Sequence, residues 1–302
     1  MLRVTTLPFQ QTMADGIQRA QAKLTASPEQ LNSGKRASSF SGLGGATHNV
    51  LSAHSMLSRN EAYSAVGKRL ETTLSFYETN LTSLDGEMSG LRQNLQNAIG
   101  MTDGSGLDAA IEGAFAQFKT MLNTSVSGEY LFAGSQSHRA PFTLGTLADV
   151  AITSNADAFA SDSVRQSARL SDEQSFSYGV DAASIGSDFL DAFRTLQAAG
   201  PFNGKLTTTQ KDALNAALQQ LDTGLGAVRA RNAENGRDFA RLDSIMGQTE
   251  QRNVMLQNVI AKNEDANLAE VAMNIAQQKT VLEASYSVFS QISGLSLAQY
   301  LR

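Results

Sequence analysis

Apolar residues in the first third of the chain recur with the spacing of a coiled-coil seam. Alternating intervals of four and three residues separate Leu70, Leu74, Tyr77, Leu81, Leu84, Met88, Leu91 and Leu95. This repeat places a narrow apolar stripe along a helix, and only a partner helix can bury a stripe of that width. Met56 and Tyr63 extend one row backwards, so we expect a single helix of about 50 residues, roughly 75 Å long.

A second seam with the same rhythm lies far away in the sequence. Its positions are Leu214, Leu218, Leu221, Leu225, Val228, Asn232, Asn235, Phe239, Leu242, Met246, Thr249, Asn253, Leu256 and Ile260. The simplest partner for each long helix is the other one, and we expect the two to pack antiparallel or nearly so. The three asparagines either fix the register of this pairing at some cost in stability or line a partly solvated stripe.

Shorter apolar stripes stand near both ends of the chain. They consist of Met13, Ile17 and Leu24 at one end and of Leu268, Val271, Ile275, Leu282, Phe289, Ile292 and Leu295 at the other. Isolated helices with such stripes are marginally stable in water, so we predict that these ten residues form an assembly interface. The C-terminal stripe is offset by one position from the preceding seam, which predicts a joint near Asn263.

Local signals place further boundaries. Ser27-Pro28-Glu29-Gln30 has the pattern of a capping box and predicts a new helix from Ser27. The small, polar segment 37–45 predicts a flexible connection. Between the long helices, the spacing of Leu107, Ile111, Phe115, Phe118 and Leu122, and that of Ile185, Phe189, Phe193 and Leu196, predicts two more helices.

The segment between these two helices predicts a small β-rich module. Alternating pairs such as Val150/Ile152 and Phe176/Tyr178 lie there among turn-forming residues. The expected fold is mainly α with a small β insert. The expected domains are a discontinuous terminal helical assembly domain (1–40 and 264–302), a coiled-coil rod domain (41–134 and 183–263) and an outer insert (135–182) that is peripheral to both seams.

Composition and motifs argue against several functions. The net charge of −5 gives no basic field for nucleic acid, and no apolar run reaches the length of a signal peptide or of a membrane span. Without cysteine, thiol chemistry and thiolate zinc sites are excluded. His48 and His54 are expected to be solvated, and Glu264-Asp265 to be a surface pair. We therefore expect no catalytic, cofactor or metal site, and no enzyme.

Three segments carry a resemblance to a known family. Leu31-Asn32-Ser33-Gly34-Lys35-Arg36, the glycine-bracketed Gly128-Glu129-Tyr130-Leu131-Phe132-Ala133-Gly134-Ser135, and the closing segment 272–302 with Ser293-Gly294-Leu295-Ser296-Leu297 resemble the flagellin-like axial proteins of the bacterial flagellum. The resemblance covers essentially the whole chain and implies an elongated, flagellin-like antiparallel helical bundle. The second and third segments favour the junction branch of this family, between hook and filament, and a filament subunit is the alternative.

The resemblance also implies partners and a location. Expected partners are copies of the chain itself in a ring or helical lattice, a neighbouring hook-associated protein, flagellin and an export chaperone. The expected location is the extracellular flagellum, reached through the flagellar type III apparatus without a cleaved signal peptide. A coiled-coil signalling adaptor remains a second alternative, but such a protein needs neither a β module between its long helices nor apolar stripes at both ends.

Overall fold

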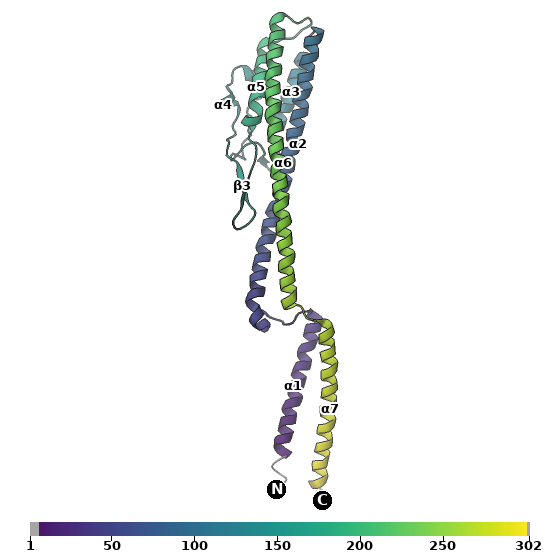
Figure 1. Cartoon of the computed structure of the whole chain (residues 1–302). Helices are drawn as coiled ribbons and strands as arrows, with labels where there is room; N and C mark the ends of the chain where they lie inside the picture. The colour runs from purple at the N-terminus through teal and green to yellow at the C-terminus, as the bar shows by residue number, and fades with distance from the viewer. Residues whose placement is uncertain (1–5, 301–302) are drawn as a thin grey trace. The chain divides into compact units, whose positions relative to one another are not determined.

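The computed structural model describes the backbone of residues 6–300 and the side chains of residues 11–291, except Met13 and Ala26 (Figure 1). The elements are α1 (Thr6–Ser33), η1 (Phe40–Ala46), α2 (Thr47–Met101), α3 (Leu107–Leu122), β1 (Ser125–Val126), β2 (Glu129–Tyr130), η2 (Leu147–Ala151), α4 (Asn155–Ala158), β3 (Gln166–Arg169), β4 (Ser175–Tyr178), α5 (Ala182–Ala199), α6 (Thr208–Glu264) and α7 (Leu268–Tyr300). The chain divides into two compact units. Residues 60–250 form the central unit, and residues 1–59 and 251–302 form the terminal unit.

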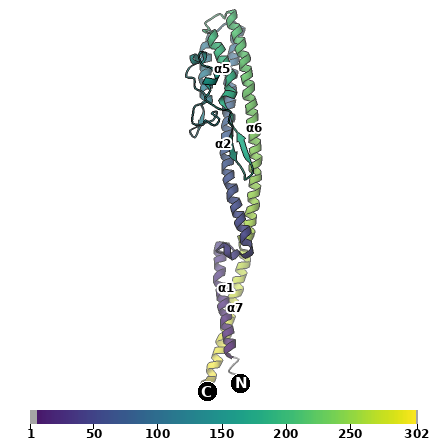
Figure 2. The same cartoon turned by 90° about the vertical axis from the view of Figure 1, so that its left-hand side faces the viewer.

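In the central unit α2 and α6 lie side by side and antiparallel, as Figures 1 and 2 show. Ion pairs join Arg92 to Asp222 at 2.5 Å and Asp85 to Arg229 at 2.6 Å, so the residue number rises on one helix as it falls on the other. All eight positions of the first seam are buried. The prediction of two long antiparallel helices with a shared seam is confirmed.

Of the two buried asparagines of the second seam, Asn235 and Asn253, the first has a partner on α2. The Asn235 side chain is 5% exposed, and its amide nitrogen donates a hydrogen bond to the backbone carbonyl of Leu74 at 2.9 Å. Asn232 is half-buried, and its amide nitrogen lies 3.4 Å from the Thr82 hydroxyl. These polar contacts tie particular positions of α6 to particular positions of α2, which is the register function expected of amides on a seam.

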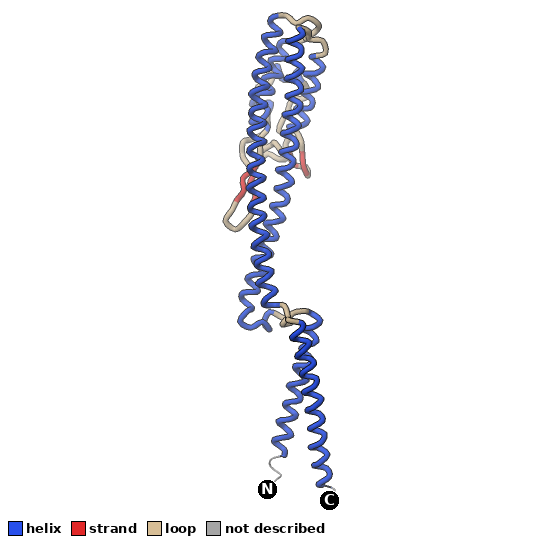
Figure 3. Tube along the Cα trace, turned by 45° about the vertical axis from the view of Figure 1, so that its right-hand side comes forward, coloured by secondary structure: helices blue, strands red, loops and turns tan. Residues whose placement is uncertain are grey.

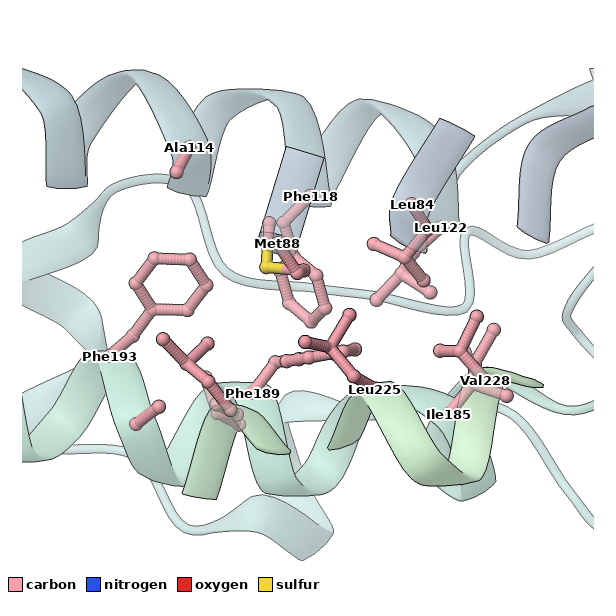
Figure 4. Packing of buried hydrophobic residues seen from close by; sticks show 14 of the residues in the cluster. Leu84, Met88, Ala114, Phe118, Leu122, Ile185, Phe189, Phe193, Leu225 and Val228 are labelled. Atoms are coloured by element: carbon pink, nitrogen blue, oxygen red, sulfur yellow. The ribbon is translucent and has the colours of Figure 1, made fainter. Parts of the chain in front are cut away.

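The core of the central unit is widened by α3 and α5, which pack against the paired helices (Figure 4). Both helices lie where the apolar spacing predicts them. Phe118 contacts Phe142, Phe189 and Phe193, with ring centroids 5.2, 6.0 and 5.6 Å away. At the close approach of α5 to α6, a Cβ on Gly224 would lie 2.7 Å from the Phe189 ring, so a glycine is required there.

The segment between α3 and α5 contains less β structure than predicted. It holds one antiparallel hairpin, β3–β4, beside the smaller β1–β2 pair (Figure 3). The Val150/Ile152 alternation was expected to form a strand, but Val150 lies in the short helix η2, where the Thr146 and Asp149 capping box starts a helical turn. Nor is the segment peripheral, because its buried side chains join the core cluster; they include Phe142, Leu144, Val150, Phe159, Leu170 and Phe176.

The terminal unit contains α1 and α7 together with the first turns of α2 and the last turns of α6. α1 and α7 pack side by side and antiparallel (Figure 1). Helix α6 ends at Glu264, and α7 begins at Leu268, close to the expected joint at Asn263. The three-part domain division drawn from the sequence stays a prediction.

Two local predictions for the terminal unit are wrong. No helix starts at Ser27, because α1 runs through Pro28 to Ser33. The Ser27 hydroxyl instead donates to the Lys23 carbonyl at 3.0 Å, and packing on α7 offsets the cost of a proline within a helix, about 3 kcal/mol. The supposedly flexible segment forms η1, in which Gly44 takes a φ of 56° that its lack of a side chain permits.

Candidate assembly surface

The predicted interface residues lie on α1 and α7, and the described ones differ in exposure. Val271 is 7% exposed, and Ile17, Leu24, Ile275 and Leu282 are half-buried. Their spacing of four and seven residues places each set on one face of its helix, and because α1 and α7 contact each other, the burial of these residues shows that this is the contacting face. Much of the predicted stripe is therefore used within the chain itself.

The remaining predicted interface residues are exposed to solvent or have side chains outside the described residues. Leu268 is 48% exposed and Phe289 is 37% exposed. The side chains of Met13, Ile292 and Leu295 lie outside the described residues, although the backbone of each is helical. The structure thus leaves Leu268 and Phe289 available to a neighbour, while the inner residues of the stripe already have intramolecular contacts.

Helix α7 also carries a second apolar row that the sequence reasoning missed. Met273 is 70% exposed, Val281 50% and Val288 41%. At 100° per residue, Val281 and Val288 lie between a quarter and a third of a turn from the face that packs on α1, and Met273 lies nearly opposite that face. The intervals of eight and seven residues were a usable signal, but the more regular stripe of Val271, Ile275 and Leu282 concealed it.

Exposed apolar side chains are concentrated in the terminal unit. In the described part of the central unit the large ones are Phe76, Met101, Ile152 and Val164. The described terminal unit has many more: Leu31, Phe40, Leu51, Met56, Val254, Met255, Val259, Leu268, Met273, Val281, Tyr286, Val288 and Phe289. Because Met56 is exposed, the prediction that the first seam extends backwards to Met56 is wrong.

The terminal unit has very little core to set against this exposed surface. Its buried apolar residues, among those described, are Val50, Ala53, Ile260 and Val271. Burial of apolar side chains is the main favourable term in folding, so this unit gains much less from its own packing than the central unit does. Large exposed apolar patches mark interaction sites, and the terminal unit is therefore the candidate assembly surface.

A polar network closes the terminal unit where α1 ends and α6 meets α7. The backbone N–H of Arg36 donates to the Glu264 carbonyl at 2.6 Å, and that of Ala266 donates to the Gly34 carbonyl at 2.8 Å. The Lys35 ammonium lies 3.2 Å from the Glu264 carboxylate and 2.7 Å from that of Asp265. Gly34 has a φ of 68°, a conformation that glycine adopts without strain.

His54 on α2 belongs to the same network, although its side chain stays 40% exposed as the prediction of a solvated residue has it. Its Nε2 lies 2.6 Å from the Glu264 carboxylate. Partial desolvation acts to raise the pKa of Glu264, but the hydrogen bonds from His54 and Lys35 together hold this pKa below its usual value. On the other side, the Asp265 hydrogen bond raises the pKa of Lys35. We call residues Gly34, Lys35, Arg36, His54, Glu264, Asp265 and Ala266 the joint network.

The described residues offer little for other kinds of function. Residues 6–300 include no helix of the length and apolarity needed to cross a bilayer. Within the same range, histidine, aspartate and glutamate side chains nowhere gather in threes in a way that could hold a metal ion.

Known proteins resemble this chain in sequence. Residues 4–137 match the family described as the bacterial flagellin N-terminal helical region. Flagellar hook-associated protein 3 of Escherichia coli (strain K12) is 25% identical over 320 residues, covering 98% of both chains.

Solved structures have the same fold. A protein of Vibrio parahaemolyticus assigned to the flagellar hook-associated proteins superposes with a TM-score of 0.62 at 19% identity, over 72% of this chain and 96% of that one. FlgL of Bacillus cereus superposes with a TM-score of 0.55 at 16% identity, over 70% of this chain and 97% of that one.

Paired long helices, an exposed apolar terminal unit and the family match are features of the structural, non-enzymatic axial proteins of the flagellin-like class. Within that class, the chain is a homologue of flagellar hook-associated protein 3. Its place is accordingly the extracellular flagellum, among other axial proteins.

Proposed function

We propose that this chain joins the flagellar hook to the filament by assembling through its terminal unit. The observation that carries the proposal is the second apolar row of α7, Met273, Val281 and Val288, which is exposed in a unit with almost no core. A helix that is apolar on two faces needs two neighbours. α1 covers one face, and an adjacent subunit in the axial structure would cover the other.

The ten residues of the predicted interface take part in the same proposal. The stripe of Ile17, Leu24, Ile275 and Leu282 would hold α1 on α7, and Leu268 and Phe289 would reach a neighbouring subunit. Assembly would offset the entropy lost when these helices are ordered, because it buries surface that the isolated chain leaves in water. The specific partners in the axial structure would be copies of the chain in a ring, a neighbouring hook-associated protein and flagellin.

Delivery of the chain is part of the proposal. Export would proceed through the flagellar type III apparatus, with a dedicated chaperone covering the C-terminal helix before assembly. The exposed apolar side chains of α7 support this, because a helix with such a surface risks aggregation until it is covered.

Deletion of the gene tests the proposed role. Cells without the protein should build hooks and release flagellin into the medium without retaining a filament. The alternative is a filament subunit, which must use the same contact at every step of an open lattice. Long filaments made of this chain, recovered as the major sheared protein, would establish the alternative.

Two charged substitutions test the assembly surface itself. Val281→Glu with Val288→Glu should abolish incorporation while leaving the thermal midpoint of the purified chain nearly unchanged, because both side chains are exposed in the isolated chain. Val164→Glu is the matched control, since Val164 is 57% exposed but lies in the central unit. Normal incorporation of the α7 double variant would refute the assignment of this row to the interface.

A further inference from the structure

The apolar contacts between α1 and α7 specify the register of the two helices only weakly, and the pair also contains a polar contact between the Gln21 amide and the Tyr286 hydroxyl. The residues of α7 that face α1 include Val271, Ile275 and Leu282, which follow one another at intervals of four and seven residues. If α1 slid by one heptad along α7, Leu282 would take the place of Ile275 and Phe289 that of Leu282, while the polar Gln278 would take the place of Val271. Repeats of similar apolar residues leave the register of paired helices weakly determined unless a polar contact selects one.

The joint network supplies contacts that a shifted register would lose. Two backbone hydrogen bonds join segment 34–36 to segment 264–266, and the Arg36 guanidinium donates to the Asp265 carbonyl at 3.0 Å. The Gln30 amide nitrogen, from the last turn of α1, donates to the Arg36 carbonyl at 2.7 Å. The network therefore ties the end of α1 directly to the start of α7.

Lys35 is the charged centre of this arrangement. Its ammonium group lies between two carboxylates, and the side chain of one of them, Glu264, is only 13% exposed. Glu264 also contacts His54, so α2 is held to the same point. A single exposed ion pair is worth little, but a sliding movement would break all of these contacts together and leave the Glu264 carboxylate without its partners.

We propose that Lys35 is a positioning residue that fixes the register of α1 on α7 and thereby sets which face of α7 is offered to a neighbouring subunit. This inference rests on the proposed function for its consequence in assembly, but the register is a property of the chain alone. Lys35 acts through the joint at residues 264–266 of its own chain. Loss of the Lys35 ammonium group should therefore change the register of α1 on α7 without a loss of helix.

Cross-linking measures the register directly, because the chain has no cysteine of its own. In the structure the Gln21 amide contacts the Tyr286 hydroxyl. Gln21→Cys with Tyr286→Cys reports the native register when treated with a short bismaleimide. Gln21→Cys with Lys279→Cys reports a register shifted by one heptad. In the otherwise native full-length chain, the first pair should cross-link in clear excess over the second.

Substitutions at position 35 then decide the proposal. Lys35→Met should lower the excess of native over shifted cross-linking, without removing the backbone hydrogen bonds of the joint, Lys35→Arg should keep it, and the circular dichroism of all variants should match. Lys262→Met is the control, because Lys262 lies on the last turn of α6 but makes no ion pair with any described residue. An unchanged excess in Lys35→Met, or no excess in the parent chain, would overturn the inference. Filament retention in cells is scored separately and tests only the proposed function.

Discussion

Truncation of one leucine in each unit should separate the stabilities of the two units. Leu81 is fully buried at the centre of the first seam. Leu81→Ala should therefore cost about 2–5 kcal/mol through lost burial and the cavity that remains. Leu282 is half-buried on α7, where water can fill the vacated space, so Leu282→Ala should cost about 1 kcal/mol or less.

Urea and thermal denaturation, both followed by circular dichroism, measure these costs. For a cooperative unit of this size each kcal/mol lowers the thermal midpoint by about 2–4 °C, so Leu81→Ala should lower it by roughly 4–20 °C. The two substitutions remove the same atoms, which makes each the chemical control of the other. Equal shifts would refute the conclusion that the core lies in the central unit.

Four further outcomes are expected. Asn235→Ala should destabilise the central unit by about 1–3 kcal/mol in urea titration, because it removes the contact to the Leu74 carbonyl. Tyr77→Phe should cost about 1–2 kcal/mol, because the Tyr77 hydroxyl donates to the buried Leu131 carbonyl at 2.6 Å. Burial also raises the pKa of the Tyr77 phenol well above its usual value, so the same loss of stability should be measured at pH 6 and pH 9. The pKa of Glu264 is lowered in the folded chain, so the joint network should stabilise the fold above the unfolded glutamate pKa of about 4.3 and weaken as the pH falls through the folded value. Hydrogen exchange of the Arg36 and Ala266 amides should show this loss of stability. Glu264→Gln should abolish the pH dependence. Replacement of residues 135–182 by a short Gly/Ser linker should give an insoluble or molten chain rather than a trimmed rod, since Phe142 and Phe176 leave the core; a cooperative unfolding transition in that variant would contradict this.

The long helices could be read from the sequence because their pattern is redundant. Each seam repeats one physical requirement, burial of every third or fourth side chain, over many turns, so single exceptions such as Asn235 do not hide the period. The helices α3 and α5 were readable for the same reason. Local repetition also located the joint, because the offset of the C-terminal stripe is a change of period that the chain itself displays.

Contacts between distant segments left no such pattern. The capping signal at Ser27 is local, and it was overridden by the packing of α1 on α7, which depends on residues more than two hundred positions away. His54 of α2 contacts Glu264 of α6, and the apolar spacing of these two helices gives no sign of this contact. The second row of α7 was hidden because one helix carries two apolar faces, and periodicity alone reports only the stronger.

The joint network also has a consequence for the order in which the chain folds. Its contacts between Lys35 and Asp265 and between Arg36 and Asp265 span 230 and 229 residues. Closing so long a loop in an unfolded chain costs about 5 kcal/mol in entropy. Once α2 and α6 have paired, the connecting segments are short and most of that cost has already been met. The two ends of the molecule should therefore be the last parts to become ordered, and a newly made chain would keep them extended until its centre has formed.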